Sequence, residues 1–149
     1  MKILKHIHKF FEITGRERVM MLEAFYWLVI YTFLIYVMPF RWWQESIGRK
    51  MQPLQEKPLT REQLWQIREV RRAVFRANKV LFGLAKCFAL SLTLKKMLQK
   101  RGMDSTLYLG VKKNGHESLL AHAWLKCGDI TVYGGRNAAV HYRELLTYT

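Results

Sequence analysis

The stretch that decides the fold is Cys87–Met103, which reads CFALSLTLKKMLQKRGM. Its apolar residues recur three and four positions apart, which is typical of a helix with one buried face. Lys100 and Arg101 followed by Gly102 are typical of a helix C-terminus, where cations and glycine are favoured. We therefore expect a helix that begins close to Cys87 and ends at Gly102.

The residues after this helix change from a helical period to an alternating one. Short runs rich in Leu, Val, Tyr and Thr are separated by the turn residues Lys112-Lys113-Asn114-Gly115 and Gly128-Asp129. Strands are expected over 105–111, 119–126 and 130–133, with a short final segment ending at Tyr148. A helix followed by an antiparallel meander predicts an α+β fold, with the helix packed on the sheet.

A second helix is predicted upstream, beginning at a capping box. Thr60 and Gln63 form the T-x-x-Q pattern, and apolar residues follow on one face with charged residues on the other. The polar stretch before it contains Pro53 and Pro58, which is typical of a linker. We interpret residues 1–51 as an N-terminal helical region, 52–60 as a linker and 61–149 as the functional domain.

The N-terminal region contains two unlike segments. Residues 1–18 are basic and amphipathic, which fits either a helix on a membrane surface or one that covers the domain. Residues 24–40, AFYWLVIYTFLIYVMPF, form a run of seventeen uncharged residues that just reaches the length needed to span a bilayer. Adjacent Glu23, Pro39 and the scattered aromatics favour a buried or membrane-docked helix instead.

Charge and cysteine content narrow the classes of partner and compartment. Lys and Arg outnumber Asp and Glu by 25 to 11, a net charge of +14, which favours acidic partners or a membrane surface. The sequence shows no zinc spacing or nucleic-acid signature, so no nucleic acid partner is expected. Two cysteines without a C-x-x-C motif favour a protein of the reducing cytoplasm. Association of this cytoplasmic protein with a membrane surface stays open.

Cys87 is the candidate nucleophile. It lies at the start of a predicted helix, where unpaired backbone N–H groups and the positive end of the dipole favour a thiolate, and Lys86 adds a positive charge. The alternative is that Cys87 is a small core residue.

His122 is the candidate base, because it lies in the middle of the apolar strand LLAHAWL. The alternative is a core histidine with both ring nitrogens satisfied. The order of the two residues along the chain favours a catalytic role, because a cysteine at the start of a helix is followed thirty-five residues later by a histidine on a strand. Trp124 is expected on the same sheet face as His122. A metal site built from Cys87, His116, His122 and Cys127 fits no standard zinc spacing, and neither a metal nor another cofactor is expected.

Three segments together resemble a known family. CFALSLTLKKMLQKRGM at 87–103, LYLGV at 107–111 and AHAWL at 121–125 are similar to the transglutaminase-like domain of lasso-peptide processing proteases. The segment 24–40 also resembles that family's N-terminal region. The resemblance implies a transglutaminase-like or papain-like cysteine protease fold and an endopeptidase that removes the leader from a ribosomally made lasso-peptide precursor.

The resemblance also implies partners that the residues themselves do not reveal. A separate leader-recognition protein would capture the precursor peptide, and an ATP-dependent lasso cyclase would receive the freed core. Residues 19–43 are the candidate docking face for a partner or a membrane. A non-catalytic adaptor and a transglutaminase-like acyl transferase stay open as alternatives.

The third member of a Cys-His triad is not settled by the sequence. It should orient the imidazole and select its tautomer. Asp129 has the right charge but is expected at a hairpin tip, roughly 20 Å from His122 along the strand. Asn137 is better placed and could act through its amide. Gly134 is expected opposite His122, and Gly134-Gly135 indicates only a turn or a strand end.

Overall fold

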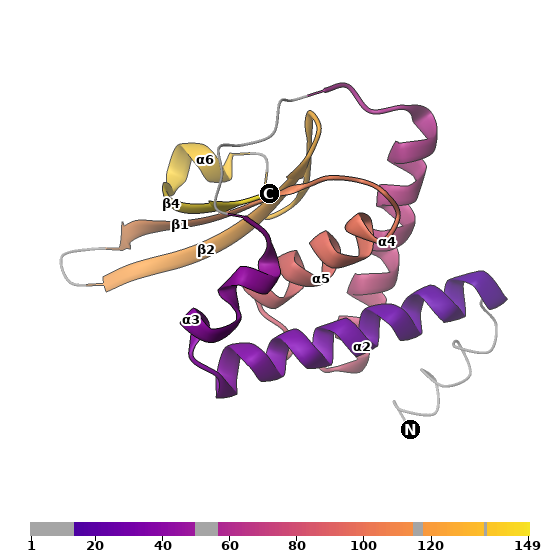
Figure 1. The fold of residues 1–149 in the computed structure, drawn as a ribbon, viewed down its shortest axis with the longest axis horizontal. Helices are drawn as coiled ribbons and strands as arrows, with labels where there is room; N and C mark the ends of the chain where they lie inside the picture. Colours follow the sequence, from indigo (N-terminus) through magenta and orange to yellow (C-terminus); the bar gives the residue numbers. More distant parts are fainter. Residues whose placement is uncertain (1–13, 50–56, 115–117, 136) are drawn as a thin grey trace.

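The computed structural model describes residues 14–49, 57–114, 118–135 and 137–149, and in it three long helices cover one face of an antiparallel sheet. The principal helices are α2 (Gly15–Val37), α4 (Arg61–Val80) and α5 (Cys87–Gln99), and the short α3 (Phe40–Trp43) and η1 (Gln44–Ile47) follow α2. The strands are β1 (Thr106–Asn114), β2 (Ser118–Cys127), β3 (Ile130–Tyr133) and β4 (Arg143–Tyr148), and α6 (Ala138–His141) lies between the last two. Figure 1 shows α5 lying between the sheet and the other long helices. The predicted α+β fold, with a cysteine-bearing helix on a histidine-bearing antiparallel sheet, is confirmed.

The sheet has the order β3-β2-β1-β4, and every neighbouring pair is antiparallel. Its two faces meet different partners because side chains alternate along each strand. Leu107, Ala123 and Leu125 join the main core with the long helices. Tyr108 and Trp124 point to the other face, where they pack with Ala138 of α6. The sheet therefore separates a helix-covered face from a smaller aromatic cluster.

Both long N-terminal helices begin with a capping box. Thr60 and Gln63 cap α4, as the sequence predicts. Thr14 and Glu17 cap α2 in the same way, so this helix begins at Gly15. The amphipathic helix expected over residues 1–18 lies largely outside the described residues, and from Gly15 onward the chain belongs to the same helix as the apolar run.

Helix α2 presents two different surfaces. Ala24, Leu28 and Tyr31 are buried in the core that α2 shares with α4 and α5. Glu23 anchors the same side through ion pairs to Lys100 at 2.9 Å and Arg101 at 2.8 Å. The outer surface exposes large apolar side chains, among them Val19, Leu22, Phe25, Tyr26, Val29, Phe33, Tyr36 and Val37.

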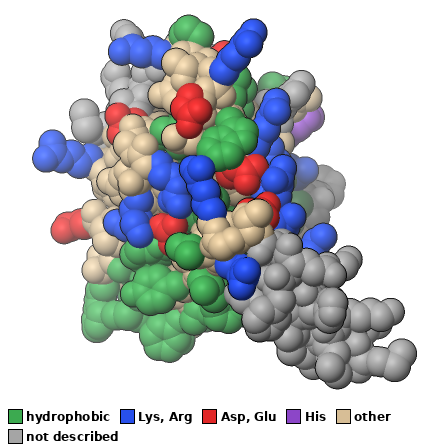
Figure 2. Space-filling model, turned by 90° about the vertical axis from the view of Figure 1, so that its right-hand side faces the viewer, with side chains coloured by type: hydrophobic (Ala, Val, Ile, Leu, Met, Phe, Trp, Pro, Cys, Tyr) green, Lys and Arg blue, Asp and Glu red, His purple; other side chains and the backbone are tan. Residues whose placement is uncertain are grey.

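The length and composition of α2 would also allow it to cross a membrane. In the space-filling view, hydrophobic side chains gather at the level that α2 occupies in Figure 1, below a region rich in Lys and Arg (Figure 2). The apolar helix expected within residues 24–40 thus buries a narrow face in the protein core and leaves large apolar side chains exposed on the rest of its surface.

Leu28 provides the test of this packing. Its side chain is fully buried between α2 and the rest of the core, so Leu28→Ala should lower the free energy of unfolding by about 3 kcal/mol through lost burial and a residual cavity. Phe33→Ala, on the exposed side of the same helix, should change it by less than about 0.5 kcal/mol. Urea denaturation of both variants measures the difference. Equal effects would contradict the packing of α2 on the domain.

Candidate functional site

Cys87 is the first residue of α5, as the sequence predicts. The N-cap residue Lys86 makes no side-chain cap, so the first-turn N–H groups of α5 have no side-chain acceptor at this position. The positive end of the helix dipole therefore lies at the cysteine, where it stabilises negative charge. Cys87 is a half-buried free thiol, so solvent and a ligand can reach it.

Tyr133, the last residue of β3, lies within electrostatic reach of Cys87. Burial is the main cause that raises the pKa of Tyr133, and the charge of Cys87 raises it further. The ring of Tyr133 also lies 5.8 Å from that of Phe75 on α4. The end of β3 is therefore close to both the thiol-bearing helix and α4.

His122 is fixed by the residue that follows Tyr133. Its Nε2 lies 2.9 Å from the carbonyl oxygen of Gly134. A carbonyl only accepts hydrogen bonds, so Nε2 must carry the proton and donate it, and Nδ1 of the neutral ring is left as the acceptor. The same ring lies 4.9 Å from Tyr142 and 6.3 Å from Trp124, between centroids, which confirms the shared face expected for Trp124.

Gly134 reaches this position because it has no side chain. Its φ is +99°, and a Cβ there would collide with Trp124 and with the backbone of Ala123. The absence of Cβ lets the chain pass closely over β2 and place its carbonyl at the imidazole. The sequence pattern identifies Gly134 only as a turn or strand end, and a glycine pair directly after a strand is the available signal. No local pattern points to Tyr142.

Within the described residues no hydrogen bond joins Cys87 and His122, and what they share is neighbours at the end of β3: Tyr133, which the charge of Cys87 affects, and Gly134, which His122 contacts. Helix α5 covers the sheet face that carries Ala123 and Leu125. The imidazole lies with Trp124 and Tyr142 on the opposite face. The sheet therefore separates the helix that carries the thiol from the imidazole, and Tyr133–Gly134 at the end of β3 is the segment adjacent to both residues.

Neither residue predicted as the third member of the triad is the hydrogen-bond partner of His122 Nε2, because that partner is the Gly134 carbonyl. Asp129 is exposed in the turn between β2 and β3. The pairing of Cys127 with Ile130 places this turn roughly 17 Å along the strand from His122, which is beyond hydrogen-bond reach. Asn137 is exposed just before α6, and its side chain makes no cap bond there. A role for either side chain stays a prediction.

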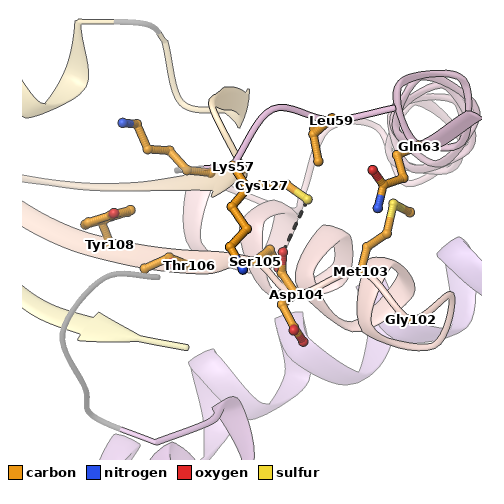
Figure 3. A pocket seen from close by; sticks show the side chains of 12 residues that line it. Lys57, Leu59, Gln63, Gly102, Met103, Asp104, Ser105, Thr106, Tyr108 and Cys127 are labelled. Atoms are coloured by element: carbon orange, nitrogen blue, oxygen red, sulfur yellow. Dashed lines mark hydrogen bonds between the residues drawn. The ribbon is translucent and has the colours of Figure 1, made fainter. Parts of the chain in front are cut away.

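The second cysteine belongs to a separate pocket at the far end of β2. Figure 3 shows Cys127 among its lining residues, with the thiol directed at Asp104. The thiol donates to the Asp104 carbonyl oxygen at 3.2 Å, and burial followed by the charge of Asp104 raises the pKa of Cys127. Such a thiol is a poor nucleophile near neutral pH. His116 lies outside the described residues, and among those described no group of three His, Cys, Asp or Glu could hold a metal.

These environments predict selective modification of Cys87. With iodoacetamide near neutral pH, Cys87 should react at least about tenfold faster than Cys127, because it is accessible and Cys127 is buried with a raised pKa. Peptide mapping of the folded protein at timed intervals measures both rates, and the single variants Cys87→Ala and Cys127→Ala assign them. Faster modification of Cys127 would contradict the assignment.

Comparison with known proteins identifies the superfamily of the chain. Residues 31–147 match the family model of the Transglutaminase-like superfamily, which covers both α5 with Cys87 and the strand with His122. No curated protein and no solved structure matches the chain. That superfamily includes cysteine proteases and acyltransferases, both of which use an activated thiol. With the match extending over most of its length, the chain belongs to the transglutaminase-like superfamily.

Proposed function

We propose that this chain is a cysteine endopeptidase that removes the leader from a lasso-peptide precursor, with Cys87 as nucleophile and His122 as general base. The observation that carries the proposal is the convergence of both residues on Tyr133–Gly134: Cys87 by its electrostatic effect on Tyr133, and His122 by its 2.9 Å contact with Gly134. The resemblance of segments 87–103 and 121–125 to lasso-peptide processing proteases supports the substrate class.

The chemistry follows from the protonation pattern of the ring. Nδ1 of His122 accepts the thiol proton as Cys87 Sγ attacks the carbonyl carbon of the scissile amide. The Cys87 backbone N–H stabilises the oxyanion of the tetrahedral intermediate. His122 then gives the proton to the leaving amine, which leaves a thioester, and water hydrolyses that thioester to release the acyl fragment and restore the thiol.

In this scheme the Gly134 carbonyl orients the imidazole of His122. An Asp or Asn side chain usually selects the tautomer of a catalytic histidine. Here a backbone carbonyl accepts from Nε2, and its position is enforced by the close passage of Gly134 over Trp124. A carbonyl lacks the negative charge of an aspartate, so it orients the ring and stabilises the imidazolium less strongly. His122 remains the group that exchanges protons with Cys87.

Two further proteins enter the proposal through the family resemblance. A separate leader-recognition protein delivers the precursor, and an ATP-dependent lasso cyclase takes the released core. The exposed apolar surface of α2 is the docking face that we propose for a partner or a membrane surface at the cytoplasmic side, because contiguous apolar patches usually bind something.

The decisive assay is mass spectrometry of the precursor peptide after incubation with this protein and its recognition partner. Wild type should cut one bond, giving two fragments whose masses sum to the precursor plus one water. Cys87→Ala and His122→Ala should each lower the rate by about a thousandfold or more, since each removes a reacting group. Cys127→Ala is the matched control and should stay within about threefold of wild type.

Other outcomes identify the competing functions. Fragments joined to an added amine in place of water would assign an acyl transferase, which the superfamily also includes. Uncut precursor in a complex that forms with wild type and Cys87→Ala alike would assign a non-catalytic adaptor and overturn the proposal.

A further inference from the structure

A cleft of about 930 Å³ lies between α4 and the outer strand of the sheet. The sheet side is formed by Lys126 and the continuous stretch 129–135, which contains all of β3. The helix side is formed by residues on one face of α4, namely Leu64, Ile67, Arg68, Arg71 and Phe75. Strand β3 is at the edge of the four-stranded sheet, and edge strands present backbone groups that can pair with a further strand.

One end of this cleft adjoins the candidate catalytic residues. Tyr133 and Gly134 line it, and these are the two residues that interact with Cys87 and His122. The Phe75 and Tyr133 rings, 5.8 Å apart, line that end of the cleft between α4 and β3. A chain lying along β3 would therefore run toward the thiol.

The charged side chains that line the cleft indicate which kind of peptide would bind there. Arg68 and Arg71 are exposed one helical turn apart on the cleft side of α4. Among the described residues neither has a carboxylate partner, although Arg71 also lies over the Phe75 ring at 5.9 Å. The described part of the lining contains one carboxylate, that of Asp129, at the opposite end from Tyr133. This arrangement is complementary to an acidic ligand.

We propose that this cleft binds the peptide substrate as an extended acidic segment, which pairs with β3 as an added strand and places its carboxylates at Arg68 and Arg71. Backbone pairing supplies affinity without regard to sequence, and the two guanidinium groups supply the preference for Asp and Glu. The inference rests on the proposed peptidase function, since it names the substrate segment that the same site takes.

The test uses the full-length Cys87→Ala protein, so that binding is measured without cleavage. The probe is a fluorescein-labelled decapeptide in which Glu alternates with Val and Thr, and the reference peptide has Gln in place of every Glu. Fluorescence anisotropy at physiological salt should show the Glu peptide binding at least about tenfold more tightly than the Gln peptide. Amide hydrogen exchange should slow in residues 130–133 when the Glu peptide is bound.

Charge reversal locates the binding site on the surface. Arg68→Glu/Arg71→Glu should weaken binding of the Glu peptide by about tenfold or more, while the control pair Arg41→Glu/Arg49→Glu, exposed residues that do not line the cleft, should change it by less than about twofold. Circular dichroism establishes that each variant is folded. Equal losses in both pairs would mean general attraction to a basic protein and would overturn the proposal, as would unchanged exchange in β3.

The two proposals can fail separately. If the Cys87-dependent cleavage is observed but the Glu peptide does not protect β3, the peptidase stands and the cleft assignment is wrong. If the Glu peptide binds as described but no precursor is cut, the cleft binds acidic peptides and the catalytic proposal is wrong.

Discussion

Helix α5 is enclosed by α2 and α4 on one side and by β1 and β2 on the other, and nine of its thirteen residues are buried. Burial extends even to Lys95, whose ammonium donates to the Ser105 carbonyl oxygen at 2.6 Å. Burial lowers the pKa of Lys95 to about 8, against the opposing effect of Asp104. Because the body of α5 cannot shift without opening the core, its first residue, Cys87, is held at a fixed point at the margin of the sheet.

The second constraint is the close approach of the Gly134 backbone to Trp124. Position 134 must be glycine for the backbone to lie this close to Trp124, and the carbonyl that results orients His122. The rings of Tyr142 and Trp124 pack beside the imidazole of His122. The two constraints have the end of β3 in common: the charge of Cys87 affects Tyr133, and the next residue, Gly134, accepts the hydrogen bond of His122. The cleft along β3 gives a peptide a route to the same place.

Local patterns were sufficient to predict most of the elements. The helix from Cys87, the three strands after it and the capping box of α4 all follow from spacing within a few residues, and the structure confirms them. The turn expected at 112–115 is wrong for its first three residues, because Lys112, Lys113 and Asn114 pair with β2 and extend the first strand. Features that depend on distant parts of the chain could not be predicted in this way. The role of Gly134 depends on how β3 leaves the sheet beside Trp124, and the burial of Lys95 depends on where the next strand begins. The two-sided character of α2 likewise reflects its packing partners, not its own period.

The central claim is that His122 is held with Nε2 as donor and Nδ1 directed to chemistry with Cys87, and nitrogen NMR of the His122 ring tests it most directly. With ¹⁵N-labelled protein, the account predicts that Nε2 stays protonated at every pH at which the protein is folded, because the Gly134 carbonyl accepts its proton. The Nδ1 resonance should shift when Cys87 is replaced by Ala and should be insensitive to Cys127→Ala. A neutral ring with the proton on Nδ1, or an Nδ1 resonance that is unchanged by loss of the Cys87 thiol, would contradict the account.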